Sequence, residues 1–192
     1  MAPLSGLDTS YGRDTLRRTL LLATLSIAAV GLAGCQTTGD LPGSRIAEAT
    51  FKTANGLPAG TAQFVSDGSR VNVVVAVAGF TPGPHGLHLH TTGKCEGPDF
   101  TSAGPHLNPG GHQHGSENPQ GSHLGDLPNV TVGSTGTGTI TATLAGTPDE
   151  VMAALFDNDG TAIVVHAGED DYKTDPAGNA GGREACGVVT RT

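Results

Sequence analysis

The sequence predicts an all-β domain, an antiparallel sandwich or barrel of about eight short strands with two long loops. Short runs of β-branched and small apolar residues recur along the chain with turn residues between them. The 30 Gly and 12 Pro among the 192 residues supply those turns, because both residue types favour sharp changes of backbone direction. Two stretches, 91–125 and 167–184, have no strand pattern and are rich in His, Asp, Gly and Pro. Loops of this length in a compact domain usually carry function.

The chain begins with the features of an export signal. A basic segment ending in Arg17-Arg18 precedes an uncharged apolar run over residues 19–33, which is too short to span a bilayer comfortably. We therefore expect residues 1–34 to be a signal peptide that is removed on export. The arginine pair faintly resembles a twin-arginine signal, so this route and the general export route both stay open.

The residues Leu32-Ala33-Gly34-Cys35 at the end of this run resemble the bacterial lipoprotein box. That resemblance implies cleavage before Cys35 and lipid on its sulfur, followed by a polar tether over residues 35–44. Several acyl chains anchor a protein stably where one chain binds only reversibly. We expect an exported protein, anchored to a bacterial membrane and facing the periplasm, with the lipid bilayer as a partner. The alternative is an ordinary signal peptide in which Cys35 is incidental.

Residues 45–192 form the predicted domain. Its strongest strand signal is the Val-rich run 71–77. Only Pro148–Leu155 is helix-like, with Thr147 as a possible N-cap and acidic residues in the first turn. The segments predicted as strands are 46–51, 60–65, 70–80, 87–90, 127–132, 138–144, 161–166 and 186–191.

Composition excludes some classes of protein. Only 15% of the residues are charged and 4% are aromatic, which does not fit a coiled coil. The formal net charge of −8 excludes binding to nucleic acid through its phosphates. The unusual feature is the set of eight His, all of which lie between residues 85 and 166.

The histidines indicate a metal site. His88 and His90 lie two apart on a predicted strand, so their side chains share one face. His166 closes a late strand, and the first long loop contains four further histidines and ends at Asp126. Neutral imidazole and carboxylate bind ions such as Zn²⁺ and Cu²⁺. A low-specificity histidine-rich metal sponge is the alternative, but it would place the histidines in flexible sequence rather than on apolar strands.

Five strings in this domain resemble copper–zinc superoxide dismutase, in the order of that family and over residues 45–192. They are Gly86-Leu87-His88-Leu89-His90, Ser102-Ala103-Gly104-Pro105-His106-Leu107-Asn108-Pro109, His123-Leu124-Gly125-Asp126-Leu127, Val164-Val165-His166-Ala167-Gly168 and Gly178-Asn179-Ala180-Gly181-Gly182-Arg183-Glu184-Ala185-Cys186-Gly187. The resemblance implies an eight-stranded, immunoglobulin-like Greek-key barrel with one copper and one zinc ion. It also implies an exported antioxidant enzyme that converts two superoxide anions and two protons to O₂ and H₂O₂ by Cu(II)/Cu(I) cycling.

The resemblance also implies the metal ligands. Copper would be held by His88, His90, His106 and His166. Zinc would be held by His106, His114, His123 and Asp126. His106 would bridge the two ions, and on reduction it would take up a proton for delivery to peroxide. His112 competes with His114 for its place, and we favour His114, eight residues after His106 as in much of the family. His85 matches no ligand position and is expected to be a surface or turn residue.

Two further residues match family positions. Asp170 resembles the carboxylate that links the ligands His88 and His114, although a solvated acidic loop is the alternative. Arg183 would stand at the mouth of the copper channel and attract a small anion, although a plain surface arginine is possible. The family's usual lysine before Gly178 is absent, because Pro176 and Ala177 stand there. Long-range steering of superoxide is therefore in doubt.

Cys95 and Cys186 are the two cysteines that remain beside Cys35. An even pair in an exported protein predicts a disulfide, which would tie the first long loop to the final strand. The spacing of Cys95 from the histidines also leaves a thiol ligand open.

Two rival functions belong to other classes. One is a copper-buffering or delivery protein on the same scaffold, which could lose a ligand or Arg183. The other is a β-sandwich interaction module, which leaves the histidines unexplained. A homodimer is possible, and no surface patch in the sequence decides it.

Overall fold

The computed structural model describes residues 42–192. The predicted signal peptide, Cys35 and most of the predicted tether lie outside these residues. Among residues 42–192, no helix combines the length and apolar character needed to cross a membrane.

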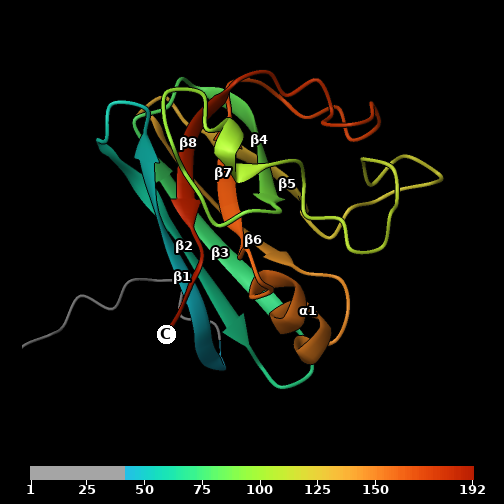
Figure 1. The fold of residues 1–192 in the computed structure, drawn as a ribbon. Helices are drawn as coiled ribbons and strands as arrows, with labels where there is room; N and C mark the ends of the chain where they lie inside the picture. Colours follow the sequence, from blue (N-terminus) through green and yellow to red (C-terminus); the bar gives the residue numbers. More distant parts are fainter. Residues whose placement is uncertain (1–41) are drawn as a thin grey trace, which may run out of the picture. The chain divides into compact units, whose positions relative to one another are not determined.

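The described domain is an antiparallel β-barrel that is nearly closed (Figure 1). In the sheet the order is β5-β4-β7-β8-β1-β2-β3-β6, and a short β9 pairs with β1. Three neighbouring pairs, β4 with β7, β8 with β1 and β3 with β6, are far apart in the chain, as Greek-key connections require. The predicted fold class is confirmed. The strands are β1 (Ser44–Thr53), β2 (Pro58–Ser66), β3 (Val71–Ala78), β4 (Gly83–His90), β5 (Asp126–Val132), β6 (Thr137–Thr143), β7 (Ala162–His166), β8 (Arg183–Val188) and β9 (Thr190–Arg191).

Alternation of side chains builds the core of the barrel. On β3, Val71, Val73, Val75 and Val77 are buried, and the residues between them point outward. Corresponding apolar residues from the other strands join them in one cluster. Each large aliphatic side chain buried in this way stabilises the fold by about 1.5–3 kcal/mol.

The helix α1 (Pro148–Leu155) begins and ends where the sequence predicts. The Glu150 amide donates to the Thr147 side chain, and the Thr147 amide donates to the Glu150 carboxylate at 2.8 Å. This capping box satisfies amides that a helix N-terminus leaves free, and Pro148 at the first position starts the turn. Val151 and Leu155 anchor the helix in the core.

The strands β4 and β7 are buried on both faces. Leu87 and Leu89 face the core, whereas His88 and His90 between them lie on the other face, beneath the long loops. On β7, Val164 joins a second small apolar cluster beneath the η1 turn (Thr101–Ala103), together with Phe100, Ala103, Ala162 and Cys186. The first long loop therefore covers a hydrophobic surface, and this fixes its position over the barrel.

Most strand boundaries differ from the prediction by one to four residues, and two of these differences have a clear structural reason or consequence. The predicted last strand divides at Val189, whose side chain is buried and whose amide donates to the Thr161 carbonyl. This residue leaves the ladder and separates β8 from β9. At the other boundary, β4 begins at Gly83, four residues before the predicted start, so that His85 lies within the strand.

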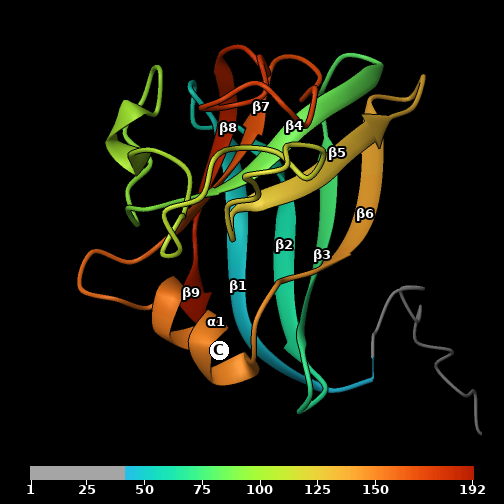
Figure 2. The same cartoon turned by 90° about the vertical axis from the view of Figure 1, so that its right-hand side faces the viewer.

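The loop 167–182 lies at the end of the barrel opposite α1 (Figures 1 and 2).

Candidate metal centre

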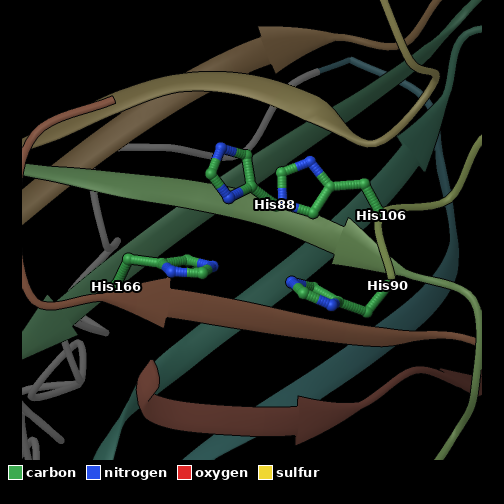
Figure 3. A group of neighbouring side chains, drawn as sticks. All are labelled: His88, His90, His106 and His166. Atoms are coloured by element: carbon green, nitrogen blue, oxygen red, sulfur yellow. The ribbon is translucent and has the colours of Figure 1, made fainter. Parts of the chain in front are cut away.

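Four histidine rings meet on the outer face of β4 (Figure 3). Two come from β4 itself, one ends β7, and one comes from the first long loop, where it forms a bridge with His90. All four are at least 95% buried, and their ligand atoms lie within 4.8 Å of one another. We call them the four-histidine group: His88, His90, His106 and His166.

Each ring in the four-histidine group has one nitrogen with a hydrogen-bond partner and one nitrogen that has no partner among residues 42–192. His88 Nε2 lies 2.7 Å from an Asp170 oxygen, and His90 Nδ1 lies 2.8 Å from the Gly104 carbonyl. His166 and His106 are held in the same way, by a carbonyl and a carboxylate. A nitrogen that faces an acceptor carries the proton, so the other nitrogen presents a lone pair. The nitrogens without a partner are His88 Nδ1, His90 Nε2, His106 Nε2 and His166 Nε2.

Buried polar atoms are rarely left without a partner, because each one costs about 1–3 kcal/mol. Four such atoms in one place, each with a lone pair, fit a cation bound between imidazoles. Burial lowers the pKa of His90 to about 2, of His166 to about 3 and of His106 to about 4. These rings are therefore neutral at neutral pH, and few protons compete with a metal for them.

A second group surrounds the Asp126 carboxylate at the start of β5. The Nδ1 atoms of His106, His114 and His123 lie 3.0, 2.9 and 3.1 Å from Asp126 Oδ1. The amides of Gly115 and His123 donate to Oδ2 and hold the carboxylate in place. We call these residues the Asp126 group: His106, His114, His123 and Asp126.

Hydrogen bonds in the Asp126 group stabilise the charged forms of Asp126 and His114. Burial would raise the pKa of Asp126, but hydrogen bonds from His106 and His114 and from two amides hold it well below its usual range. Burial would lower the pKa of His114, but hydrogen bonds to Asp126 and Asp170 raise it to about 9. Without a metal, a proton on His114 therefore offsets the carboxylate charge.

Around Asp126, the residues whose possible ligand atoms all lie within 4.8 Å of one another include His88 as well as His106 and His114. Its Nε2 already faces Asp170, and its free Nδ1 belongs to the four-histidine group. His123, by contrast, directs Nδ1 at Asp126 and lies 3.4 Å from His106 Nδ1. His106 is the member that the two groups share.

Asp170 lies between the two groups with its side chain fully buried. Its Oδ2 atom lies 2.7 Å from His88 Nε2, and its Oδ1 atom lies 3.0 Å from His114 Nε2. Burial would raise the pKa of this carboxyl, but the hydrogen bonds from these two rings hold it well below its usual range. Asp170 is thus not part of a solvated acidic loop. It fixes one nitrogen of each ring and leaves the other nitrogen for a ligand bond.

Arg183 lies opposite His166 in the β7–β8 ladder. Its Nη1 donates to the Phe100 carbonyl at 2.6 Å, and its Nη2 donates to the Gly104 carbonyl at 2.7 Å. These bonds hold the half-buried guanidinium beside the four-histidine group, with its positive charge uncompensated by any carboxylate salt bridge among residues 42–192. Such a group can attract an anion toward the histidines.

His85 contradicts the expectation of a surface or turn residue. It is 1% exposed, its Nδ1 lies 2.8 Å from the His166 carbonyl and its Nε2 lies 2.9 Å from the Thr81 carbonyl. Because β4 extends back to Gly83, His85 shares the inward face with Leu87, and the period of two could have shown this. His112, in contrast, is exposed, and His114 occupies the place beside Asp126.

Cys95 and Cys186 form the predicted disulfide, with their Cα atoms 5.6 Å apart. The thiol-ligand alternative for Cys95 is therefore wrong. Cys186 belongs to the small apolar cluster, so the bond joins β8 to the covered face of the first long loop.

Comparisons with known proteins agree with this geometry. Residues 58–189 match the family described as copper/zinc superoxide dismutase. A superoxide dismutase [Cu-Zn] of Aquifex aeolicus is 41% identical and covers 68% of this chain and 79% of its own length. One from Deinococcus radiodurans is 40% identical over 89% of this chain and 96% of its own. Among solved structures, a double mutant of a SOD-like protein from Bacillus subtilis has a TM-score of 0.70 at 35% identity, covering 76% of this chain and 98% of its own.

Proposed function

The chain belongs to the copper/zinc superoxide dismutase family, and we propose that the four-histidine group holds its copper ion and the Asp126 group its zinc ion. The activity follows from the family: the protein is a superoxide dismutase, an oxidoreductase that uses copper and zinc. The observation that carries the ligand assignment is the set of four buried ring nitrogens without partners. The four-histidine group thus fits copper by donor type, protonation and position, and the Asp126 group fits zinc by donor type and position.

The bound ions, Arg183 and the histidines have separate roles in the reaction. When bound, copper supplies the one-electron acceptor and donor for conversion of two superoxide anions and two protons to O₂ and H₂O₂, while zinc supplies fixed positive charge. Arg183 attracts the anion and, through its bonds to two carbonyls, holds that charge in one place. His88, His90 and His166 keep their free nitrogens aimed at one point, because the opposite nitrogen of each ring is tied.

His106 is the residue that can move a proton. Its Nδ1 faces the Asp126 group and its Nε2 faces the four-histidine group. A proton held on Nε2 would therefore stand beside the reacting anion and could be delivered to peroxide as it forms. Asp126 keeps Nδ1 in place during this transfer.

The location of the enzyme is also part of the proposal. The basic segment, the apolar run and the Leu32-Ala33-Gly34-Cys35 string support export and lipid attachment at Cys35, with the domain facing the periplasm. Growth with a clickable fatty acid tests this. We expect label on the wild-type protein and none on Cys35→Ala, and equal labelling of the two would refute the anchor.

Metal analysis and a superoxide-consumption assay test the assignment on the same samples. Wild-type protein is expected to hold one copper and one zinc per chain and to consume superoxide far faster than buffer. His166→Ala should lose copper and activity but keep most of its zinc, whereas Asp126→Ala should mainly lose zinc. His112→Ala is the matched control and should bind both ions. If metal-loaded wild-type protein consumed superoxide no faster than buffer, copper buffering would be the better function. Equal loss of both metals in both variants would refute the assignment of copper to the four-histidine group and zinc to the Asp126 group.

A further inference from the structure

The side chain of Asn129 is attached to the backbone of Asp170. Asn129 Nδ2 donates to the Asp170 carbonyl at 2.9 Å, and the Asp170 amide donates to Asn129 Oδ1 at 2.9 Å. One side-chain amide thus takes the place of a neighbouring strand, because it satisfies both main-chain groups of a residue in the loop 167–182. The two residues are 41 positions apart in the chain.

A β-bulge explains how Asn129 reaches the loop. In the β4–β5 ladder, His85 pairs with Val130 and Leu87 pairs with Leu127. The single residue Gly86 on β4 therefore lies opposite two residues of β5, Pro128 and Asn129. A bulge of this kind turns a side chain out of the regular alternation, and bulges are common beside active sites.

Tyr172 holds the other end of the same arrangement. The Tyr172 hydroxyl accepts a hydrogen bond from the Asn129 backbone amide at 2.8 Å, and the Tyr172 backbone amide donates to Asp170 Oδ1 at 2.7 Å. Asn129, Asp170 and Tyr172 therefore form a closed set of hydrogen bonds between β5 and the loop. The backbone of Asp170 cannot rotate without breaking at least two of them.

The position of the Asp170 backbone decides where its carboxylate points. Both carboxylate oxygens are committed, one to His88 Nε2 and one to His114 Nε2. A short side chain such as aspartate reaches two separate rings only when its Cα atom and its χ1 angle are fixed. The bonds to Asn129 fix the Asp170 backbone, and the Tyr172 backbone amide, which donates to Oδ1, helps to fix the carboxylate.

We propose that Asn129 is a positioning residue, which aims the Asp170 carboxylate at His88 and His114 and so sets the orientation of one ligand in each metal group. The proposal rests on the metal assignment made above. Partners that orient metal ligands typically contribute 10–100-fold to metal affinity. Loss of the Asn129 side-chain amide should therefore weaken metal binding even though Asn129 contacts none of the proposed metal ligands.

Asn129→Asp is the sharpest test, because it keeps the shape and one acceptor but places a carboxylate oxygen against the Asp170 carbonyl. The control is Asn72→Asp on β3, which adds the same charge and keeps its acceptor role toward the Thr143 hydroxyl, remote from the site. Wild-type protein and both variants are stripped of metal, and the Zn²⁺ affinity of each is measured by competition with a chelator. Co²⁺ is then bound in place of zinc, and its visible absorption spectrum is recorded.

We expect Asn129→Asp to bind Zn²⁺ about tenfold or more weakly and to shift and weaken the Co²⁺ bands, with both readings unchanged in Asn72→Asp. Zn²⁺ affinity within twofold of wild type together with an unaltered Co²⁺ spectrum would overturn the proposal. If Asn129→Asp does not fold, Asn129→Ser decides by the same criteria, since serine cannot reach both Asp170 groups. Wild-type protein that failed to bind zinc would refute the metal assignment instead, so the two failures are distinguishable.

Discussion

Mild acid should unfold the metal-free domain, because several of its histidines are neutral when folded and protonated when unfolded. In the folded domain the pKa values of His90, His166 and His106 are about 2, 3 and 4, against an ordinary histidine pKa of about 6.5. Each lowered pKa contributes stability that is fully present above pH 6.5 and is lost as the pH falls toward the folded value. The unfolded chain takes up three more protons than the folded chain over that range.

The size of the effect follows from linkage. One histidine that is protonated only after unfolding lowers the free energy of unfolding by up to about 1.4 kcal/mol per pH unit. Integrated from pH 7 to pH 5, the three residues together remove about 6 kcal/mol. His114 acts in the opposite direction: with its pKa raised to about 9, its contribution grows as the pH falls from 9 to 6.5 and is constant below. The net loss is about 5 kcal/mol, comparable to the whole stability of many domains.

Urea unfolding curves, followed by circular dichroism at half-unit steps of pH with a chelator present, measure this loss. His166→Gln should reduce it by about a third, because one buried titrating group is gone. His112→Gln removes an exposed histidine and should leave the pH dependence as in wild type. An unfolding free energy that stays constant between pH 7 and 5, or equal slopes for His166→Gln and wild type, would show that these rings do not titrate as their burial requires.

Three further predictions test other parts of the structure. Replacing Cys95 and Cys186 together by Ala opens a loop with a sequence separation of 91 and should cost about 4–5 kcal/mol, measured by urea unfolding; a loss below about 1 kcal/mol would contradict the constraint. Gly178→Ala places a Cβ atom within 2.7 Å of His114 Nε2 and against the Asp170 carboxylate, at a backbone φ of 61° that favours glycine. The Zn²⁺ affinity of this variant should fall at least tenfold. Gly182→Ala, whose Cβ atom meets no atom within 4 Å, is the control. Arg183→Ala should lower the second-order rate with superoxide about tenfold and weaken its dependence on ionic strength, as pulse radiolysis at two salt concentrations would show; an unchanged rate would remove the anion-attracting role.

Local sequence signals predicted most of the fold. Thr147 as the N-cap and the acidic residues of the first turn placed α1 without error, since a helix start depends on residues within one turn. The valine run of β3 predicted its strand for the same reason, because alternation is a property of neighbouring residues. Pairing of distant strands is not local, and the Greek-key arrangement was available only through resemblance to a family.

Residues of the candidate site that belong to a sequence motif could be predicted, whereas residues that only the fold brings to the site could not. His88 and His90 follow from their spacing on a strand, and Asp170 follows from the family pattern. Asn129 has no such signal, because its partner is 41 residues away and its direction depends on a bulge. The burial of His85 could have been deduced, but only with the strand start placed four residues earlier.

One backbone oxygen links the substrate side of the site to its metal side. The Gly104 carbonyl accepts hydrogen bonds from His90 Nδ1 and from Arg183 Nη2. A ligand ring and the anion-attracting charge therefore share a single anchor on the first long loop, and the disulfide at Cys95 fastens that loop to the barrel nine residues earlier. Any displacement of this loop would therefore move His90, a proposed copper ligand, and the Arg183 guanidinium together, so a substitution in loop residues that contact neither side chain would change both positions.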